Sequence, residues 1–379
     1  TATPVPTAVP TAIPSPTVTP MPPVEGTEGY FSYVIENGEV TITEFLGDSS
    51  VTEVTIPEKI QGYPVTSIGF SVFYSDSDLV KVTIPEGVTS LAESTFAECG
   101  KLSSVTLPNS ITSIGDSVFA QCSTLESINL PEGITSIGYE VFVDCSKLST
   151  LTLPKSITSI GAGAFNGCSS LTNVTIPEGV SRIEDATFSG CSKLTSITIP
   201  NSVVSIGASA FQGCRGLTSL TILDGTTSIG DAAFKYCIGL TTINLPSSVE
   251  TIGAEAFSGC TNVTNVYLLE GVTTIGEKAF FGCSSLNYID LPSSVTSLGE
   301  RAFSGCSNLG SITVLENVDS IGSYTFSGCD NVVMIVMPDS YAETYAKEKK
   351  ITYQIFPTPL EFFKYKIEDE KVTITGITD

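Results

Sequence analysis

The segment LESINLPEGITSIGYEVFVDCSK, residues 125–147, decides the fold because the chain repeats it along most of its length. The 23 residues before it, 102–124, read LSSVTLPNSITSIGDSVFAQCST and carry leucine, proline, glycine, phenylalanine and cysteine at the same positions. Every gap between neighbouring cysteines is 23 residues: Cys99, Cys122, Cys145, Cys168, Cys191, Cys214, Cys237, Cys260, Cys283, Cys306 and Cys329. A fixed period of this size is typical of a stacked repeat protein, in which each repeat packs against its neighbours.

One repeat contains two extended pieces. Val105 and Leu107 alternate with a polar residue, which is the period of a half-buried strand, and Pro108 ends that strand because it cannot donate a backbone hydrogen bond. Residues 111–114 form a second extended piece with its threonine and serine facing outward. Strands of successive repeats then pair in parallel about 4.8 Å apart. We therefore predict a right-handed coil stack with a parallel sheet.

The rest of the repeat turns the chain. Gly115 suits a turn with positive φ. Val118, Phe119 and Cys122 fit one tight helical or 3-10 turn that points inward. No coil buries these side chains alone, so stacking makes the continuous core.

The two ends of the repeat region differ from its middle. We assign 28–50 to a β-hairpin cap around Asn37-Gly38, 51–338 to the solenoid and 339–356 to a C-terminal cap. In the last, partial copy we expect Val332, Ile335 and Met337 in the core positions. Ser340 and Glu343 form a capping box, so we predict a short helix there.

Two terminal segments lie outside the repeats. Residues 1–24 hold eight prolines, six threonines and no charge, so 1–27 is predicted to be a linker or stalk. Residues 357–379 resemble the N-terminal hairpin and are predicted to form a hairpin like the start of a further module. The chain has neither an initiator methionine nor a signal peptide, and we expect it to be a mature or excised piece of a longer protein.

The repeat resembles the BspA-like leucine-rich-repeat family in its 23-residue bacterial form. Residues 125–131 match the run Leu-x-x-Ile-x-Leu-Pro, and residues 134–145 match Ile-x-x-Ile-Gly-x-x-Val-Phe-x-x-Cys. The resemblance covers roughly residues 30–356. It implies a curved parallel-sheet solenoid, a place on the cell surface, and adhesion to host proteins or other cells. Fold alone does not fix this function.

Composition narrows the function. Of 379 residues, 41% are apolar, and the net charge is −23. Nucleic acids and anionic membrane surfaces attract basic proteins, so we expect neither as a partner. No apolar run approaches 18 residues, so we expect no membrane insertion of this fragment. Without histidine, a Ser-His or Cys-His nucleophile is impossible, and we predict no enzyme and no cofactor.

The cysteines and acidic turns follow the repeat. The thiols run in a line rather than converging on one point, which argues against zinc. Disulfides between neighbouring coils remain an alternative to a packed, reduced column, which we favour because parallel side chains hold their Cβ atoms too far apart. Acidic turn residues recur every 46 residues and are predicted to be solvated, with calcium-binding or catalytic carboxylates as the alternative: Glu86, Glu132, Glu178, Asp224, Glu270 and Glu316.

Outward strand positions supply the candidate binding residues. Most hold serine, threonine or asparagine, but Tyr267, Tyr288 and Asp290 break the pattern on neighbouring strands, next to Asn265. Phe281 is a second exposed candidate, in a position that is otherwise mostly small or polar. Tyrosine supplies rigid amphipathic contact area. Drift at tolerant surface positions, or the preference of strands for tyrosine, would also explain these residues.

We therefore expect a secreted or cell-surface binding protein without chemistry, extracellular or on a bacterial surface. It would bind a protein or glycan through its strand face and act as a monomer. The alternative is a passive spacer that holds another domain away from the cell. A binder needs a localised non-repetitive patch, whereas a spacer is uniform along its length.

Overall fold

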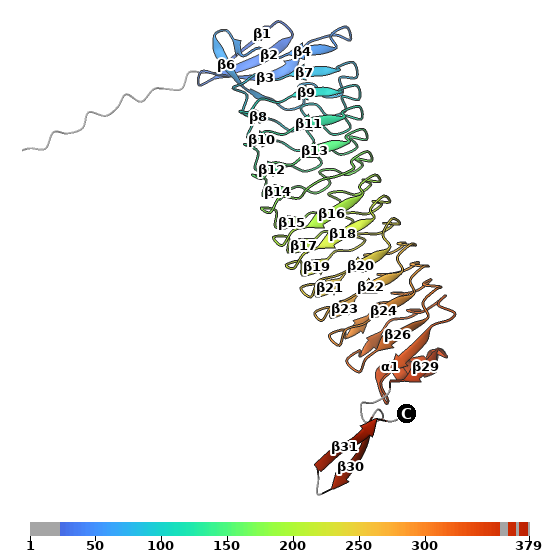
Figure 1. The fold of residues 1–379 in the computed structure, drawn as a ribbon. Coiled ribbons are helices and arrows are strands. Elements are labelled where there is room, and N and C mark those ends of the chain that lie inside the picture. Colours follow the sequence, from blue (N-terminus) through green and yellow to red (C-terminus); the bar gives the residue numbers. More distant parts are fainter. Residues whose placement is uncertain (1–22, 357–362, 369–370, 378–379) are drawn as a thin grey trace, which may run out of the picture.

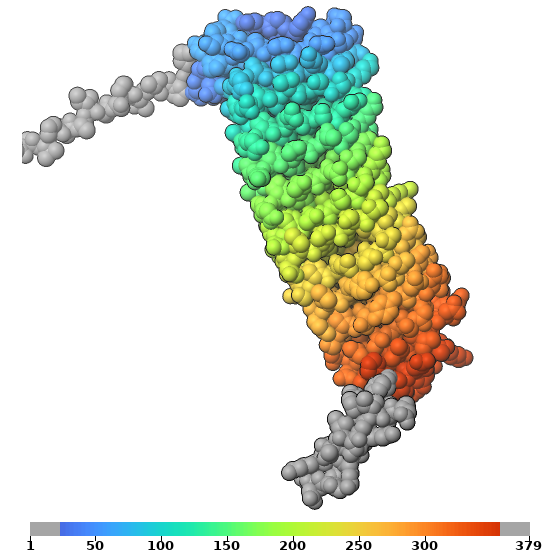
Figure 2. Space-filling model, in the orientation of Figure 1, coloured from blue at the N-terminus to red at the C-terminus, as the bar shows by residue number. Residues whose placement is uncertain are grey.

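The chain forms a solenoid in which successive coils stack along one axis (Figure 1). The computed structural model describes residues 23–356, 363–368 and 371–377. Residues 1–22, most of the expected linker, lie outside the described residues. In the space-filling view, colours follow one another along the stack in chain order (Figure 2). Each coil therefore contacts mainly the coils before and after it.

The coils contribute strands to two columns, one strand to each, except that the coil of residues 171–193 has only an isolated bridge, from Asn173 to Thr150, in the first column. The first column contains β4 (Glu53–Thr55), β7 (Lys81–Thr83), β9 (Ser104–Thr106), β11 (Ser127–Asn129), β13 (Thr150–Thr152), β16 (Ser196–Ile199), β18 (Ser219–Ile222), β20 (Thr242–Asn244), β22 (Asn265–Tyr267), β24 (Tyr288–Asp290), β26 (Ser311–Val314) and β28 (Val333–Val336). The second contains β6 (Tyr63–Ile68), β8 (Ser90–Leu91), β10 (Ser113–Ile114), β12 (Ser136–Ile137), β14 (Ser159–Ile160), β15 (Arg182–Ile183), β17 (Ser205–Ile206), β19 (Ser228–Ile229), β21 (Thr251–Ile252), β23 (Thr274–Ile275), β25 (Ser297–Leu298) and β27 (Ser320–Ile321).

Parallel pairing joins equivalent positions of neighbouring coils. Ser196 pairs with Ser219, and Ser205 pairs with Ser228, each 23 residues away. Buried and exposed residues alternate along the strands. In β24, for example, Ile289 is buried, whereas Tyr288 and Asp290 on either side of it are exposed. This alternation confirms the predicted parallel solenoid.

The last coil departs from the predicted register. Ile312 pairs with Met334, only 22 residues away, and Val314 pairs with Val336. Met334 and Val336 are fully buried, so the expectation that Ile335 and Met337 fill the core positions is wrong. The strand is apolar at every position, so hydrophobicity could not distinguish its two faces, and losing one residue moves every side chain to the other face.

The turn side of the coil is built from tight turns that also pair between coils. Ala120 N–H donates to Ser117 and Cys122 N–H donates to Phe119, both across three residues as in a 3-10 turn. Phe119 N–H donates instead to Val141 of the next coil at 2.9 Å. Backbone hydrogen bonds thus join neighbouring coils at the turns as well as at the strands.

Gly115 serves a different purpose from the one predicted. Its φ is not positive; the positive φ belongs to Ser117, at 54°. A Cβ at Gly115 would lie 2.8 Å from the backbone nitrogen of Glu93 in the preceding coil. The same crowding occurs at Gly230, where the nearest backbone atom would be 2.7 Å away. Most coils therefore hold glycine at this position because the backbones of adjacent coils approach closely there; Ala92 and Glu184 are the exceptions.

A phenylalanine ladder forms the centre of the core. Twelve rings, one per coil from Phe73 to Phe326, stack with centroids 5.0–5.7 Å apart. The ladder closes against Phe45 at one end, with centroids 4.9 Å apart, and against Tyr345 at the other, at 6.5 Å. Each cap therefore covers the terminal phenylalanine ring at its end of the ladder with an aromatic ring of its own.

The N-terminal cap is a mixed sheet. β1 (Val24–Glu28), β2 (Phe31–Glu36) and β3 (Glu39–Phe45) pair antiparallel, and β3 then pairs in parallel with β6. β5 (Lys59–Ile60) also pairs with β6. The hairpin predicted around Asn37-Gly38 is β2–β3, and it covers the edge strand of the second column. β1 lies partly inside the stretch 1–27 that was expected to be a linker, so the ordered cap begins at Val24.

The C-terminal cap contains a helix, as the capping box predicts. In α1 (Tyr341–Lys349), the Ser340 hydroxyl accepts a hydrogen bond from Glu343 N–H. The Glu343 carboxylate accepts one from Asp339 N–H rather than from Ser340 N–H. β29 (Thr352–Ile355) then pairs with β28 and extends the first column. β30 (Phe363–Glu368) and β31 (Lys371–Ile377) form an antiparallel pair whose register shift matches that of β2–β3.

Candidate functional site

The four strand residues singled out from the sequence lie together. Tyr267 on β22 pairs with Asp290 on β24, and Asn265 pairs with Tyr288. These four residues, here called the strand-face patch, form the corners of a rectangle with the two tyrosines on one diagonal. Side chains on adjacent strands are close enough to act on one ligand.

Both tyrosines of the strand-face patch are exposed. The exposed fraction is 47% for Tyr267 and 45% for Tyr288. Partial burial, then the negative charge of Asp290, raise the pKa of Tyr288 above its ordinary value. The Asn265 amide donates to the Thr264 hydroxyl at 3.0 Å, which fixes its direction. The patch therefore offers two ring faces, hydroxyl groups and a carboxylate on a rigid sheet.

Phe281 lies apart from the strand-face patch, on the turn side of its coil. It lines a hollow of about 350 Å³ together with charged and aromatic residues of neighbouring coils. We call this the turn-face hollow, lined by Lys235, Tyr236, Glu255, Ser258, Gly259, Lys278, Phe281, Gly282 and Arg301. Of these residues, sequence reasoning identified only Phe281. Lys235, Tyr236, Lys278 and Arg301 also depart from the residues that most coils hold at their positions, and that signal could have found them.

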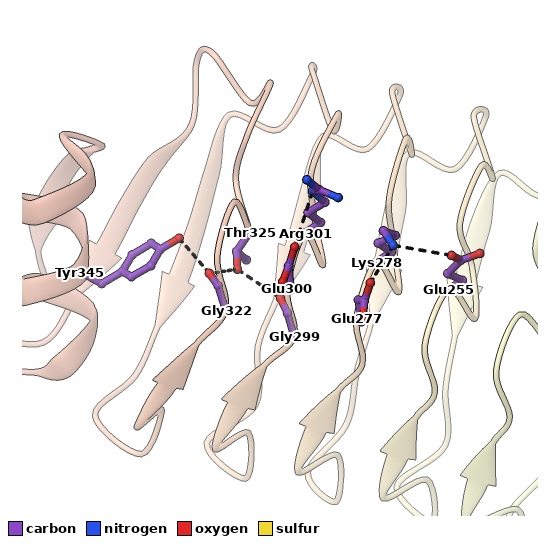
Figure 3. A network of polar contacts seen from close by, with 9 residues as sticks. All are labelled: Glu255, Glu277, Lys278, Gly299, Glu300, Arg301, Gly322, Thr325 and Tyr345. Carbon is purple, nitrogen blue, oxygen red and sulfur yellow. Dashed lines mark hydrogen bonds and ion pairs between the residues drawn. The ribbon is translucent and has the colours of Figure 1, made fainter.

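Charged side chains form a row along this side of the stack (Figure 3). The Lys278 ammonium lies 2.6 Å from a Glu277 carboxylate oxygen and 4.0 Å from one of Glu255. Lys235 is also paired with Glu255. The hydrogen bond and charge of Glu277 raise the pKa of Lys278, while Lys278 lowers the pKa of Glu277. These pairs hold the lysines in place beside the hollow.

The row continues to the C-terminal cap. The Arg301 Nε lies 3.9 Å from a Glu300 oxygen, beyond hydrogen-bond range, and its guanidinium sits 5.3 Å from the Tyr324 ring centroid. The buried Thr325 hydroxyl bonds the carbonyl oxygens of Gly299 and Gly322, and the Tyr345 hydroxyl donates to Gly322 (Figure 3). These bonds join the last coils to α1.

The cysteines form a reduced column inside the stack. All eleven are free and buried. Each thiol donates to a phenylalanine carbonyl oxygen of the preceding coil, as Cys122 does to Phe96 at 3.2 Å. Burial raises the pKa of Cys214 and Cys283 to about 12. The thiols therefore have a structural role, because they supply hydrogen bonds to buried phenylalanine carbonyl groups.

We also searched the described residues for a metal site and for a membrane-spanning helix. No group of three or more histidine, cysteine, aspartate or glutamate residues there has an arrangement suited to a metal ion. No helix in that part of the chain is both long and apolar enough to cross a membrane. Glu270, one of the acidic turn residues, accepts hydrogen bonds from Ser293 and Ser294 of the next coil, which lower its pKa.

Comparisons with known proteins agree with the geometry. The model of the BspA type leucine rich repeat region matches residues 39–172, 142–264 and 227–356. A leucine-rich cell surface protein from Faecalibacterium prausnitzii is 29% identical, with a TM-score of 0.58, over 86% of this chain and 98% of that one. A leucine-rich repeat protein from Bacteroides ovatus is 26% identical, with a TM-score of 0.62, over 90% and 100%.

A more distant structure shares the fold alone. The pneumococcal vaccine antigen PcpA is 18% identical, with a TM-score of 0.51, over 88% of this chain and 99% of that one. No relative of the chain was found among curated protein sequences. The repeat, the parallel columns and the family model together place this chain in the BspA-type leucine-rich-repeat family, to which it belongs.

Proposed function

We propose that this chain is a cell-surface binding protein that holds an extracellular protein or glycan on its strand-face patch. The observation that carries the proposal is the registered group of Tyr267, Tyr288 and Asp290 in columns that mostly hold serine, threonine or asparagine. The similar protein of F. prausnitzii is described as a cell surface protein, which supports the location. Leucine-rich-repeat proteins generally bind other molecules and are generally not enzymes, which supports a binding role.

The chemistry of the patch suits recognition. Exposed tyrosine rings give rigid contact area, and their hydroxyl groups, Asp290 and Asn265 give hydrogen-bond donors and acceptors. The rings already stand on a sheet that is fixed by parallel pairing, so little freedom is lost when a ligand binds. The proposal needs no chemical step and no cofactor.

The test compares wild-type protein with Tyr267→Ser/Tyr288→Ser against arrays of extracellular-matrix proteins and glycans. Several coils hold serine at the position of Tyr288 and threonine at that of Tyr267, so the free energy of unfolding should stay within about 0.5 kcal/mol. Loss of two central aromatic anchors should weaken binding by about 30-fold or more. Tyr139→Ser is the matched control, because Tyr139 is exposed but lies on a turn.

The outcome separates binder from spacer. A ligand that binds wild type and Tyr139→Ser, but not the double variant, supports the proposal. A ligand held equally well by the double variant removes the strand-face patch from the function. If no array member binds the wild-type chain, the passive spacer becomes the better account of the solenoid.

A further inference from the structure

Three neighbouring coils carry a concentrated departure from the repeat on their turn side. Lys235 and Phe281 occupy a position that holds serine in the coil between them and in the coil that follows. Tyr236 occupies a position that holds glycine in the next four coils and has a positive φ of 61°. The positive φ itself belongs to the repeat, since Glu98, Gln121 and Asp144 adopt it at the equivalent position, so the departure lies in the side chain.

Glycine makes the turn-face hollow possible. A Cβ at Gly259 would lie 2.5 Å from Cδ1 of Tyr236, so the tyrosine ring occupies the space beside this glycine. At Gly282 a Cβ would meet no atom within 4 Å, so the space there is open. Phe281, 40% exposed, stands beside that opening. The hollow thus has an aromatic ring on each side and open backbone between them.

The cations of the hollow differ in how firmly they are paired. Lys235, Lys278 and Arg301 line the hollow beside Glu255, which pairs with both lysines, and Lys278 also pairs with Glu277. Arg301 has the loosest pair, because its Nε lies 3.9 Å from a Glu300 oxygen, beyond hydrogen-bond range, so a ligand carboxylate can compete for its guanidinium. A planar guanidinium matches a carboxylate with two parallel hydrogen bonds.

We propose that the turn-face hollow binds an acidic sugar residue, with the sugar ring between Tyr236 and Phe281 and its carboxylate on Arg301. About 350 Å³ suits a ring-sized ligand and lies at the small end of ligand sites. A free acidic side chain would fill only a small part of this space and leave the aromatic faces unused. This site is separate from the strand-face patch and does not depend on its function.

The experiment titrates the full chain with three small probes and follows binding by calorimetry or ligand-observed NMR. Methyl glucuronide has both ring and carboxylate, methyl glucoside has the ring alone, and N-acetylglutamate amide has the carboxylate alone. Methyl glucuronide should bind at least about tenfold more tightly than either, which corresponds to about 1.4 kcal/mol. Absence of glucuronide binding, or equal binding of the glutamate derivative, overturns the proposal.

Three variants assign the parts of the site. Arg301→Ala should reduce glucuronide affinity to the level of the glucoside and leave glucoside binding unchanged. Phe281→Ser, which restores the residue of the neighbouring coils, should weaken both sugars. Gly282→Gln should block both by filling the open space; Gln121 occupies the equivalent position at a φ of 59°, so the substitution suits the backbone.

Two controls keep the result specific. Gly190→Gln makes the same change in an equivalent position away from the hollow and should leave binding unaltered. Tyr267→Ser/Tyr288→Ser should also bind glucuronide normally, which separates this site from the strand-face patch. Glucuronide binding that survives Gly282→Gln would place the sugar elsewhere and overturn the proposal.

Discussion

At the scale of single residues, the repeat imposes two kinds of constraint. Inward positions must fill the core, and the glycine of each Ile-Gly pair must let the backbones of two coils approach. Outward positions such as Tyr267 face neither demand, because their side chains do not touch the core. Residues that depart from the repeat at outward positions therefore cost the fold little, which is why they carry the functional argument.

Gly230→Ala should destabilise the chain by about 1–3 kcal/mol, as overpacking does. The added Cβ would come within 2.7 Å of the Gly207 backbone, which parallel pairing prevents from moving. Gly310→Ala is the control, since a Cβ there meets nothing within 4 Å and its φ is not positive. Urea unfolding measures both, and equal stability of the two variants would contradict this role of the glycine.

At the scale of the single coil, the sequence predicted the elements well and their ends less well. The 23-residue period located both strands, the inward phenylalanine and the buried cysteine because each is a periodic pattern with a distinct chemistry. It failed at Gly115, because close backbone approach and positive φ both favour glycine. It failed at Ile335, because an apolar run without alternation does not mark its buried face.

The candidate sites were predictable to different degrees. The strand-face patch followed from register alone, since residues 23 apart lie side by side on adjacent strands. The turn-face hollow did not, because its residues come from four coils and its opening depends on how the Tyr236 ring lies over Gly259. The direction of the Tyr236 side chain is set by its packing against neighbouring coils. An alignment of the repeats contains no information about that packing.

The column of thiols makes stability fall at alkaline pH. Burial raises the pKa of Cys214 and Cys283 to about 12, above the value of about 8.5 in an unfolded chain. The folded state therefore keeps protons that the unfolded state releases, so the contribution is complete below pH 8.5 and is lost as pH rises toward 12. At pH 10 each such thiol should cost about 2 kcal/mol relative to pH 7.5.

Urea unfolding at pH 7.5 and 10 measures this loss. Tyrosine and lysine residues also titrate there, so the comparison needs Cys214→Ser/Cys283→Ser, whose hydroxyl groups can donate to the same carbonyl oxygens without titrating. The variant should lose distinctly less stability between the two pH values than the wild type. An identical decline would show that the thiols do not set the alkaline limit.

At the scale of the whole molecule, stability should be close to a sum over coils and their interfaces. The continuous ladder of rings and the closing residues Phe45 and Tyr345 mean that the ends, rather than any central coil, need special sequences. Coils can then be removed without changing the fold. The acidic turns decide how many coils should be removed at once. They recur every 46 residues and alternate with non-acidic turns, so the sequence pattern repeats every two coils.

Removing two coils should therefore disturb the chain less than removing one. Deletion of residues 104–149 joins Ser103 to Thr150 and places Lys155 where Asn109 N–H now meets the Glu86 carboxylate, at 3.3 Å. Deletion of 104–126 places Glu132 there instead, so two carboxylates face each other across adjacent coils. Two like charges about 4 Å apart in water repel by about 1 kcal/mol.

Both deletion variants should fold and unfold cooperatively, and the two-coil variant should be about 10 Å shorter in solution scattering. It should also be the more stable per coil in urea at low salt. High salt should narrow the difference, because exposed charges are screened. Equal stability at low salt would contradict the alternating-turn argument, whereas loss of cooperative unfolding in both variants would contradict the additive view of the stack. Neither deletion reaches residues 235–301, so both candidate sites should bind as they do in the full chain.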